Sequence, residues 1–200
     1  MLYTGKGDSG NTSFFNCDQR FSKSSEMAEA LGSVDEINSL LGLCKVRTQI
    51  YADQTQINAD TASARISAKI SGIRESLVEI VGQVQQDLFI IQASLAGADK
   101  KITKEKILYL EKIIAEIEKE LPEIKSFFVS GGTELAALLD YSRTVARRAE
   151  RRVVELSEKE KNKVAPEILA YLNRISSLLY ALARFVNYKE GIKEQSPSYD

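Results

Sequence analysis

Apolar residues recur at intervals of three and four through most of the chain after residue 24. This period places them on one side of a helix, the side that packs against a core. Five segments follow the pattern, separated by polar stretches or by glycine and proline. They are residues 25–48, 66–95, 103–121, 134–158 and 166–191. The pattern therefore predicts an all-α fold, a five-helix bundle.

Two stretches do not follow the helical period. Residues 1–24 are rich in Gly, Ser, Thr and Asn, and residues 49–65 are polar and fit either a loop or the weak start of the next helix. Two hundred residues suit one domain. We therefore predict a single domain, residues 1–200, made of an N-terminal segment (1–24), a helical bundle (25–191) and a short tail (192–200).

The composition excludes several classes of protein. The chain contains no His, which removes Ser-His and Cys-His catalysis, the usual zinc sites and the His ligands of ferritin-like di-iron bundles. A formal net charge of −1 is untypical of nucleic-acid-binding domains, which are usually basic. Cys17 and Cys44 form no CxxC pair, and we expect both to be reduced thiols.

No feature of the sequence indicates a membrane or an export route. No apolar run approaches the roughly 18 residues of a membrane span. The first residues, MLYTGKGDSG, have neither a hydrophobic signal core nor an Arg-rich transit pattern. We expect a cytoplasmic protein that binds neither membrane nor nucleic acid.

Positive charge collects on the fourth predicted helix, where residues 142–152 read SRTVARRAERR and include five arginines and one acid. At 100° per residue, much of this charge falls on one side of the helix. Such a cluster fits either a solvated helix face or a site for a concentrated anion, because a guanidinium group binds phosphate or carboxylate through paired hydrogen bonds. The residues on that side are Asp140, Arg143, Arg147, Glu150 and Arg151.

Polar residues also interrupt two other helices. Asp35 and Asn38 share one side of the first helix, and Asn173 and Arg174 interrupt the apolar pattern of the fifth. A buried amide is usually hydrogen-bonded wherever it occurs. These positions therefore fit structural polar groups as well as a binding site.

A glycine-rich stretch at residues 5–10 matches the pattern G-x-G-x-x-G. A dinucleotide fingerprint needs a preceding strand and a βαβ unit, and a P-loop needs a lysine where Asn11 stands, so both motifs fail. Glycine N–H groups, hydroxyls and lysines nevertheless suit a phosphate. The alternative is a flexible terminal tail. The candidate phosphate-binding side chains are Thr4, Lys6, Thr12, Ser13 and Lys23.

Four ordered segments carry a family resemblance. The first two are YTGKGDSGNTS, similar to Y-T-x-x-G-D-x-G-x-T-S, and GSVDEINSLLGL, similar to G-x-V-D-E-L-N-S-x-x-G. The others are FFVSGGTELAALLDYSRTVARRAERRVVEL, similar to F-I-L-P-G-G-x-E-L-A…A-R-T-V-x-R-R-A-E-R-x-V, and YLNRISSLLYALAR, similar to Y-L-N-R-L-S-D-L-L-F-x-L-A-R. Together they resemble the PduO-type ATP:cob(I)alamin adenosyltransferases, also called corrinoid adenosyltransferases. The matches span most of the chain and leave out chiefly residues 49–75.

The resemblance implies a homotrimer of five-helix bundles with active sites between subunits. Its reaction transfers the 5′-deoxyadenosyl group of ATP to the cobalt of cob(I)alamin and releases triphosphate. Mg²⁺ would accompany ATP, although the resemblance identifies no metal-binding residue. A reductase would supply cob(I)alamin, and an adenosylcobalamin-dependent enzyme is a candidate acceptor of the product.

Site residues are carried over by position from the same resemblance. Arg143 would pair with Asp35 across the subunit boundary, and Phe127 would lie against the corrin and help displace its lower axial ligand. Arg147 is the arginine expected to matter most for catalysis. The ATP-binding residues would be Thr4, Gly5, Lys6, Gly7, Thr12, Ser13, Lys23, Arg147, Arg148, Glu150, Arg151 and Asn173.

The sequence departs from the family pattern at two points. Ser130 replaces a frequent proline before Gly-Gly, which loosens the expected turn and lets Phe128 share the role of Phe127. The family's T-K-T-G reads Thr4-Gly5-Lys6-Gly7 here, so the lysine is shifted by one position. Two other functions fit the sequence: a non-catalytic helical adaptor whose arginine face binds an acidic partner or nucleic acid, and a family member that carries or senses adenosylcobalamin without turnover.

Overall fold

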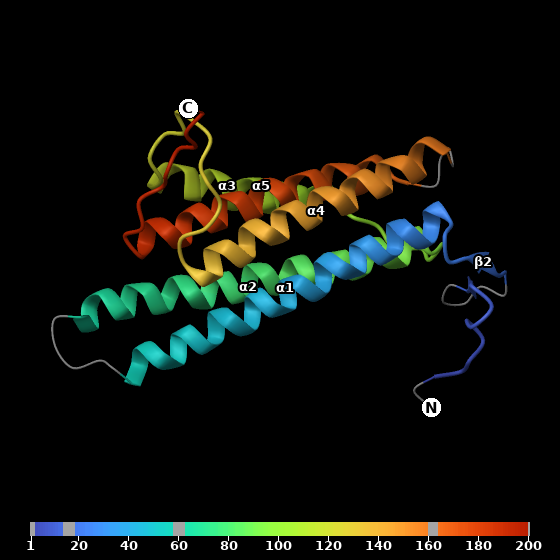
Figure 1. Cartoon of the computed structure of the whole chain (residues 1–200), viewed down its shortest axis with the longest axis horizontal. Coiled ribbons are helices and arrows are strands. Elements are labelled where there is room, and N and C mark those ends of the chain that lie inside the picture. The colour runs from blue at the N-terminus through green and yellow to red at the C-terminus, as the bar shows by residue number, and fades with distance from the viewer. Residues whose placement is uncertain (1–2, 14–18, 58–62, 160–163, 200) are drawn as a thin grey trace.

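The computed structural model describes residues 3–13, 19–57, 63–159 and 164–199. The described residues form five helices and a very small sheet (Figure 1). The helices are α1 (Glu26–Ile57), α2 (Ser63–Leu95), α3 (Lys104–Glu120), α4 (Glu134–Lys159) and α5 (Pro166–Lys189). The prediction of an all-α fold with five helices is confirmed.

The first two helices are longer than their apolar pattern predicts. α1 continues through polar residues to Ile57, and α2 begins at Ser63. Residues 49–57 are therefore helical, and 58–62 lie outside the described residues. Ala and Gln, which occur in this stretch, have good helix propensities, so a helix persists there without an apolar stripe.

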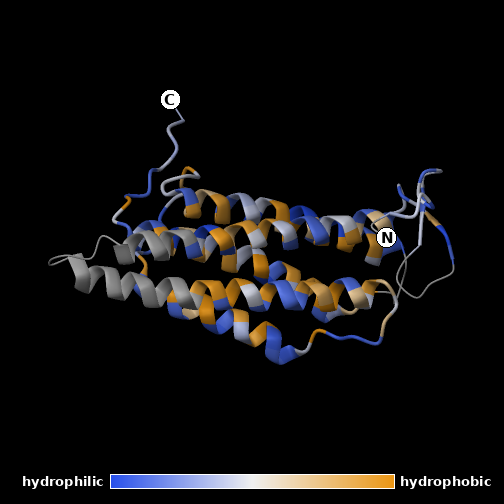
Figure 2. Ribbon diagram, turned by 90° about the horizontal axis from the view of Figure 1, so that it is seen from below, coloured by the Kyte–Doolittle hydropathy of each residue, from blue (hydrophilic) through white to orange (hydrophobic). Residues whose placement is uncertain are grey.

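The helices pack side by side in the order α2, α1, α4, α5 and α3, with α4 between α1 and α5 (Figure 1). Apolar and polar residues both recur along the coloured parts of the helices, as in amphipathic packing (Figure 2). One side of α4 packs into the core, and Leu138 is only partly buried against it. The buried apolar residues of α4 are Leu135, Ala136, Leu139, Val145, Ala146, Ala149, Val153 and Leu156.

A two-stranded antiparallel sheet precedes α1. It pairs β1 (Asn11–Thr12) with β2 (Phe21–Ser22), in the register Asn11 to Ser22 and Thr12 to Phe21. The sequence did not predict this sheet, because strands of two residues are too short to show alternation. The sheet lies at the end of the bundle where α1 begins, away from the C-terminus (Figure 1).

A buried polar junction ties α2, α3 and α5 together. Asp87 is 1% exposed; it accepts hydrogen bonds from Tyr171 Oη at 2.7 Å and Gln83 Nε2 at 3.0 Å, and pairs with Lys106 Nζ at 2.5 Å. Burial, and then the Asp87 carboxylate, raise the pKa of the Tyr171 hydroxyl far above its usual value. The junction therefore holds a carboxylate with its partners inside the bundle.

The structure also describes one of the two cysteines and the apolar character of the helices. Cys44 is a buried free thiol, as predicted, and burial raises the pKa of its thiol. Cys17 lies outside the described residues. Among the described helices, none has the length and apolar character needed to cross a membrane.

Candidate functional site

A hollow of about 570 Å³ opens between α4, α5 and the loop that joins α3 to α4. The loop contributes Phe127 and Phe128, and α4 contributes Arg143 and Arg147. Four predicted site residues from two sequence segments therefore meet at one place. Ser176, Ser177 and Tyr180 of α5 complete the wall, and they were not among the site residues predicted from the sequence.

The two phenylalanines of the loop lie in different surroundings. The Phe127 side chain is 81% exposed, whereas Phe128 is half-buried and lies under the Arg184 guanidinium, 5.1 Å from carbon to ring centre. A ring exposed at the mouth of a hollow is available to an apolar ligand. Phe127, rather than Phe128, has this property.

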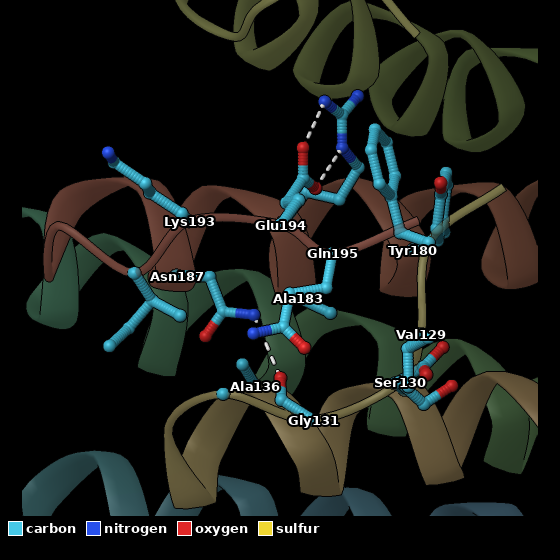
Figure 3. Close-up of a pocket in the computed structure, with 15 residues that line it drawn as sticks. Val129, Ser130, Gly131, Ala136, Tyr180, Ala183, Asn187, Lys193, Glu194 and Gln195 are labelled. Carbon is cyan, nitrogen blue, oxygen red and sulfur yellow. Dashed lines mark hydrogen bonds and ion pairs between the residues drawn. The ribbon is translucent and has the colours of Figure 1, made fainter. Parts of the chain in front are cut away.

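Asn187 of α5 anchors the turn that follows Phe127. Its Nδ2 donates to Gly131 O at 2.9 Å (Figure 3), and its Oδ1 accepts from Thr133 N at 3.0 Å. Gly132 has φ +97°, and a Cβ there would lie 2.3 Å from Asn187 Oδ1. The turn therefore needs glycine at this position, and the side chain of Asn187 holds it although Ser130 replaces the proline.

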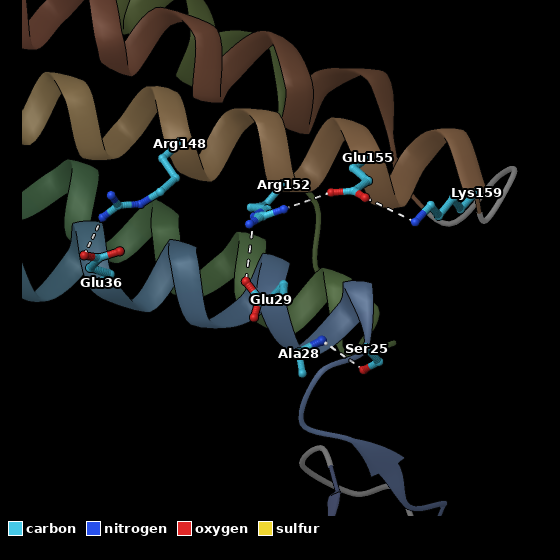
Figure 4. Close-up of polar contacts among 8 residues, drawn as sticks. All are labelled: Ser25, Ala28, Glu29, Glu36, Arg148, Arg152, Glu155 and Lys159. Carbon is cyan, nitrogen blue, oxygen red and sulfur yellow. Dashed lines mark hydrogen bonds and ion pairs between the residues drawn. The ribbon is translucent and has the colours of Figure 1, made fainter. Parts of the chain in front are cut away.

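One side of α4 carries arginines that pair with acids of α1. Arg148 pairs with Glu36 of α1 at 2.5 Å, and Arg152 pairs with Glu29 at 3.7 Å (Figure 4). At the end of α4, Lys159 pairs with Glu26 at 2.6 Å. Glu36 and Glu29 neutralise part of the arginine cluster. Because both acids lie on α1, the charges of α4 alone did not indicate this pairing.

The other side of α4 faces α5. Arg143 pairs with Asp140 at 2.5 Å, and Glu150 accepts a hydrogen bond from Asn173 Nδ2 at 2.9 Å. Among the described residues, Arg147 and Arg151 have no hydrogen-bond or ion-pair partner, and both side chains are exposed. Two fixed cations therefore remain available beside the hollow and the Glu150–Asn173 pair.

The glycine-rich start forms an ordered loop. Asp8 N donates to Gly5 O at 3.2 Å, Gly10 N donates to Gly7 O at 3.1 Å, and Gly5 and Gly10 have positive φ. A Cβ on Gly7 would lie 3.1 Å from Lys23 Nζ, so the ammonium group of Lys23 lies directly over this glycine. Thr4, Lys6 and Ser13 are exposed, whereas Thr12 is half-buried in β1. The described part of the loop is therefore folded around Lys23.

One chain does not bring all the predicted residues together. The glycine-rich loop lies beside the start of α1, at the opposite end of the bundle from the loop of Phe127 (Figure 1). Asp35 accepts a hydrogen bond from Gln92 of α2 at 3.3 Å, whereas Arg143 bonds Asp140 on its own helix. The predicted Asp35–Arg143 pair between subunits stays a prediction, since one chain does not test it.

A family model described as cobalamin adenosyltransferase matches residues 2–186. The chain belongs to the cobalamin adenosyltransferase family. Over 191 residues it is 35% identical to the corrinoid adenosyltransferase of Bacillus subtilis (strain 168), which covers 96% of this chain and 89% of that protein.

Two solved structures of PduO-type adenosyltransferases from Lactobacillus reuteri also resemble this family member. A phenylalanine-to-histidine variant complexed with cobalamin and ATP has a TM-score of 0.78 and 28% identity, covering 100% of this chain and 97% of that one. An arginine-to-lysine variant complexed with ATP has a TM-score of 0.78 and 27% identity, covering 98% and 100%. The helical architecture is therefore shared along the whole chain.

The site of this cobalamin adenosyltransferase family member consists of arginines, one carboxylate–amide pair, hydroxyls and an exposed phenyl ring. The described residues contain no group of three or more His, Cys, Asp or Glu side chains able to hold a metal ion. Guanidinium groups are suited to binding anions, and an exposed phenyl ring is suited to covering an apolar ligand.

Several supporting residues were missed by the sequence analysis. Arg20 donates from Nη2 to Lys6 O and, at 3.0 Å, to Asn11 O, which fastens the glycine-rich loop. Asn187 and Arg184 hold the Phe127 loop. Asn187 and Arg184 interrupt the apolar face of α5, as Asn173 and Arg174 do. A polar residue within an apolar stripe is the sequence signal that could have identified them.

Proposed function

We propose that this protein transfers the 5′-deoxyadenosyl group from ATP to the cobalt of cob(I)alamin and releases triphosphate. The observation that carries the proposal is a single hollow that combines the exposed ring of Phe127 with the unpaired guanidinium of Arg147. Membership of the cobalamin adenosyltransferase family supports the same reaction. A purely docking role for the arginine face is less well supported, because Arg152 already pairs with Glu29 of α1 and Glu155 of α4.

The chemistry explains why the chain needs no histidine. Co(I) supplies the electron pair that forms the Co–C5′ bond, and the C5′–O bond breaks as triphosphate leaves. The substrate is therefore its own nucleophile, and the protein positions the reactants and stabilises the negative charge on the leaving group. Arg147 and Arg151 provide that positive charge, and Phe127 covers the corrin face and excludes water.

The neighbouring structures support the choice of these two residues. The substituted phenylalanine and the substituted arginine of the Lactobacillus reuteri enzyme lie twenty positions apart in its chain. Phe127 and Arg147 have the same separation here. These are the residues that the hollow brings together.

We infer that the nucleotide site is completed between subunits of a homotrimer. In one chain the glycine-rich loop and the Phe127 loop lie at opposite ends of the bundle, so a second copy would supply the missing half. Arg143 would then exchange Asp140 for Asp35 of its neighbour, and Arg148 would exchange Glu36 for a phosphate. The proposed ATP-binding residues are Thr4, Gly5, Lys6, Gly7, Thr12, Ser13 and Lys23 from one copy, with Arg147, Arg148, Glu150, Arg151 and Asn173 from the other.

Mg²⁺ is proposed to enter with ATP. This ion is usually bound by substrate phosphates, several waters and one or two carboxylates. The described residues contain no acidic cluster, and Glu150 beside Asn173 is the carboxylate nearest in chain position to the unpaired arginines. The donor set therefore fits an ion held mainly by the triphosphate, where it would neutralise charge on the leaving group.

The proposal is tested by incubating the protein anaerobically with ATP, Mg²⁺ and chemically reduced cobalamin. Formation of the light-sensitive adenosylcobalamin spectrum, with one triphosphate per product, is the expected result. Binding of cobalamin without product would instead indicate a carrier or sensor. In the cell, a reductase would have to supply cob(I)alamin, and an adenosylcobalamin-dependent enzyme is the proposed acceptor.

A further inference from the structure

The chain after α5 folds back onto the loop of Phe127, and we call residues 190–199 the C-terminal strap. Gly191, with φ +71°, lets the chain reverse, and Ile192 N donates to Asn187 O at 2.9 Å. Farther along, Val129 N donates to Gln195 O at 2.8 Å, and the hydroxyls of Ser126 and Ser196 lie 2.7 Å apart. The strap therefore contacts the loop on both sides of Phe127 and Phe128.

Arg184 of α5 lies beneath both segments and is 6% exposed. It holds Glu194 of the strap through two bonds, Nε to Oε1 at 2.5 Å and Nη2 to Oε2 at 2.8 Å (Figure 3). The same Nη2 donates to Pro122 O at 3.1 Å, where the loop begins, and the guanidinium lies over Phe128. One buried cation thus joins the strap, the start of the loop and the ring next to Phe127.

Besides its hydrogen bonds to the strap and to Asn187, the loop has little apolar support. Most of its residues from Pro122 to Ser130 are exposed, so apolar burial contributes little to its position. A buried, two-bonded Arg–carboxylate pair has a fixed geometry that an exposed loop lacks. The Arg184–Glu194 pair can therefore determine where the loop lies.

We propose that Arg184 and Glu194 are positioning residues for the corrinoid step, and that they act by fixing the Phe127 loop against the C-terminal strap. This inference rests on the proposed function, since it assigns the pair a role in the same reaction. Neither residue touches the reacting atoms. Their effect reaches the substrate through Phe127, which the loop presents at the mouth of the hollow.

The test compares Glu194→Gln with Glu120→Gln in the full-length protein. Both substitutions neutralise an acid paired with a cation of α5, but Glu120, the last residue of α3, pairs with Lys189 and not with Arg184. Steady-state adenosylation is measured against cob(I)alamin and against ATP, with thermal unfolding as a check on the fold. We expect Glu194→Gln to lower kcat/KM for cob(I)alamin by about tenfold or more, because small misplacements are costly in catalysis. The KM for ATP and the behaviour of Glu120→Gln should stay near wild type.

The same substitution is also made in the Phe127→Ala variant, to test whether its effect depends on the Phe127 ring. In Phe127→Ala, adding Glu194→Gln should cause no further loss, since the ring that the pair positions is absent. Three results would overturn the inference and leave the proposed function intact. They are additive losses of activity in the double variant, equal losses of kcat/KM for cob(I)alamin and for ATP, and a Glu194→Gln variant that behaves like Glu120→Gln. A wild-type protein that forms no adenosylcobalamin would overturn both.

Discussion

Arg147 and Arg152 lie five residues apart on α4 and have different neighbours. Arg147 opens onto the hollow beside Phe127 and has no partner among the described residues, whereas Arg152 is paired with Glu29 and Glu155. A cation that is already paired adds little to an anion site, and an unpaired one retains its capacity for hydrogen bonding. At the scale of single residues, the cluster therefore divides into a functional side and a structural side.

Replacement of Arg147 should show this division. Arg147→Ala is expected to lower kcat by about 10²–10³, because it removes a donor that stabilises charge in the transition state. Arg147→Lys keeps the charge but loses the planar pair of donors, so it should also be clearly impaired. The measurement is steady-state adenosylation against ATP concentration, with circular dichroism to confirm folding.

Arg152→Ala is the matched control on the same helix. It removes two exposed ion pairs, each of which contributes little to stability, and its activity should stay near wild type. If Arg147→Ala and Arg152→Ala behaved alike, the arginine cluster would be a solvated helix face, and the assignment of Arg147 would be wrong.

Phe127 and Phe128 make a second contrast at this scale. Phe127→Ala should keep the KM for ATP and lose most turnover, because the exposed ring serves the corrin and has no contact with phosphate. Phe128→Ala removes the ring stacked on Arg184, so we expect a smaller loss. The two variants are compared by adenosylation kinetics; normal turnover in Phe127→Ala with loss in Phe128→Ala would reverse the assignment.

At the scale of elements, the sequence predicted what depends on local periodicity and missed what depends on neighbours. The five helices could be found because their apolar stripes repeat over many turns. The β1–β2 pair has two residues per strand, and the polar end of α1 has no apolar stripe, so neither gave a periodic signal. The acids that pair with Arg148 and Arg152 lie on α1, more than 100 residues away in the chain.

The buried junction between α2, α3 and α5 leads to a prediction about alkaline stability. Because the pKa of Tyr171 is raised, the unfolded chain releases the phenolic proton above about pH 10 while the folded chain retains it. The unfolded state then binds fewer protons, so this group's contribution to stability is complete below pH 10 and declines as the pH rises further.

Tyr171→Phe should therefore lose about 1 kcal/mol of unfolding free energy at neutral pH, the value of one buried hydrogen bond. Its stability should decline less steeply than that of the wild type above about pH 10. Urea unfolding followed by circular dichroism measures both quantities. Tyr188→Phe, on the same helix but exposed, is the control and should follow the wild-type curve. An equally steep decline in Tyr171→Phe would contradict the assigned role.

At the scale of the whole molecule, the main feature is the distance between the two halves of the proposed site. The glycine-rich loop and the Phe127 loop lie at opposite ends of one bundle (Figure 1). Family motifs identified both halves from the sequence, and the resemblance implied that active sites lie between subunits. The fold adds that one chain keeps the two loops apart, which local sequence patterns do not indicate.

The central claim is that the loop of one copy and the arginine face of another form one adenosyl-transfer site. It is tested by mixing Lys23→Ala and Arg147→Ala chains, each impaired alone, so that mixed trimers assemble. If subunits associate at random, about one quarter of the sites receive an intact loop from one copy and an intact α4 from its neighbour. Adenosylation by the mixture should then rise to about a quarter of the wild-type rate. A mixture no more active than the mean of its two parents would contradict the shared site.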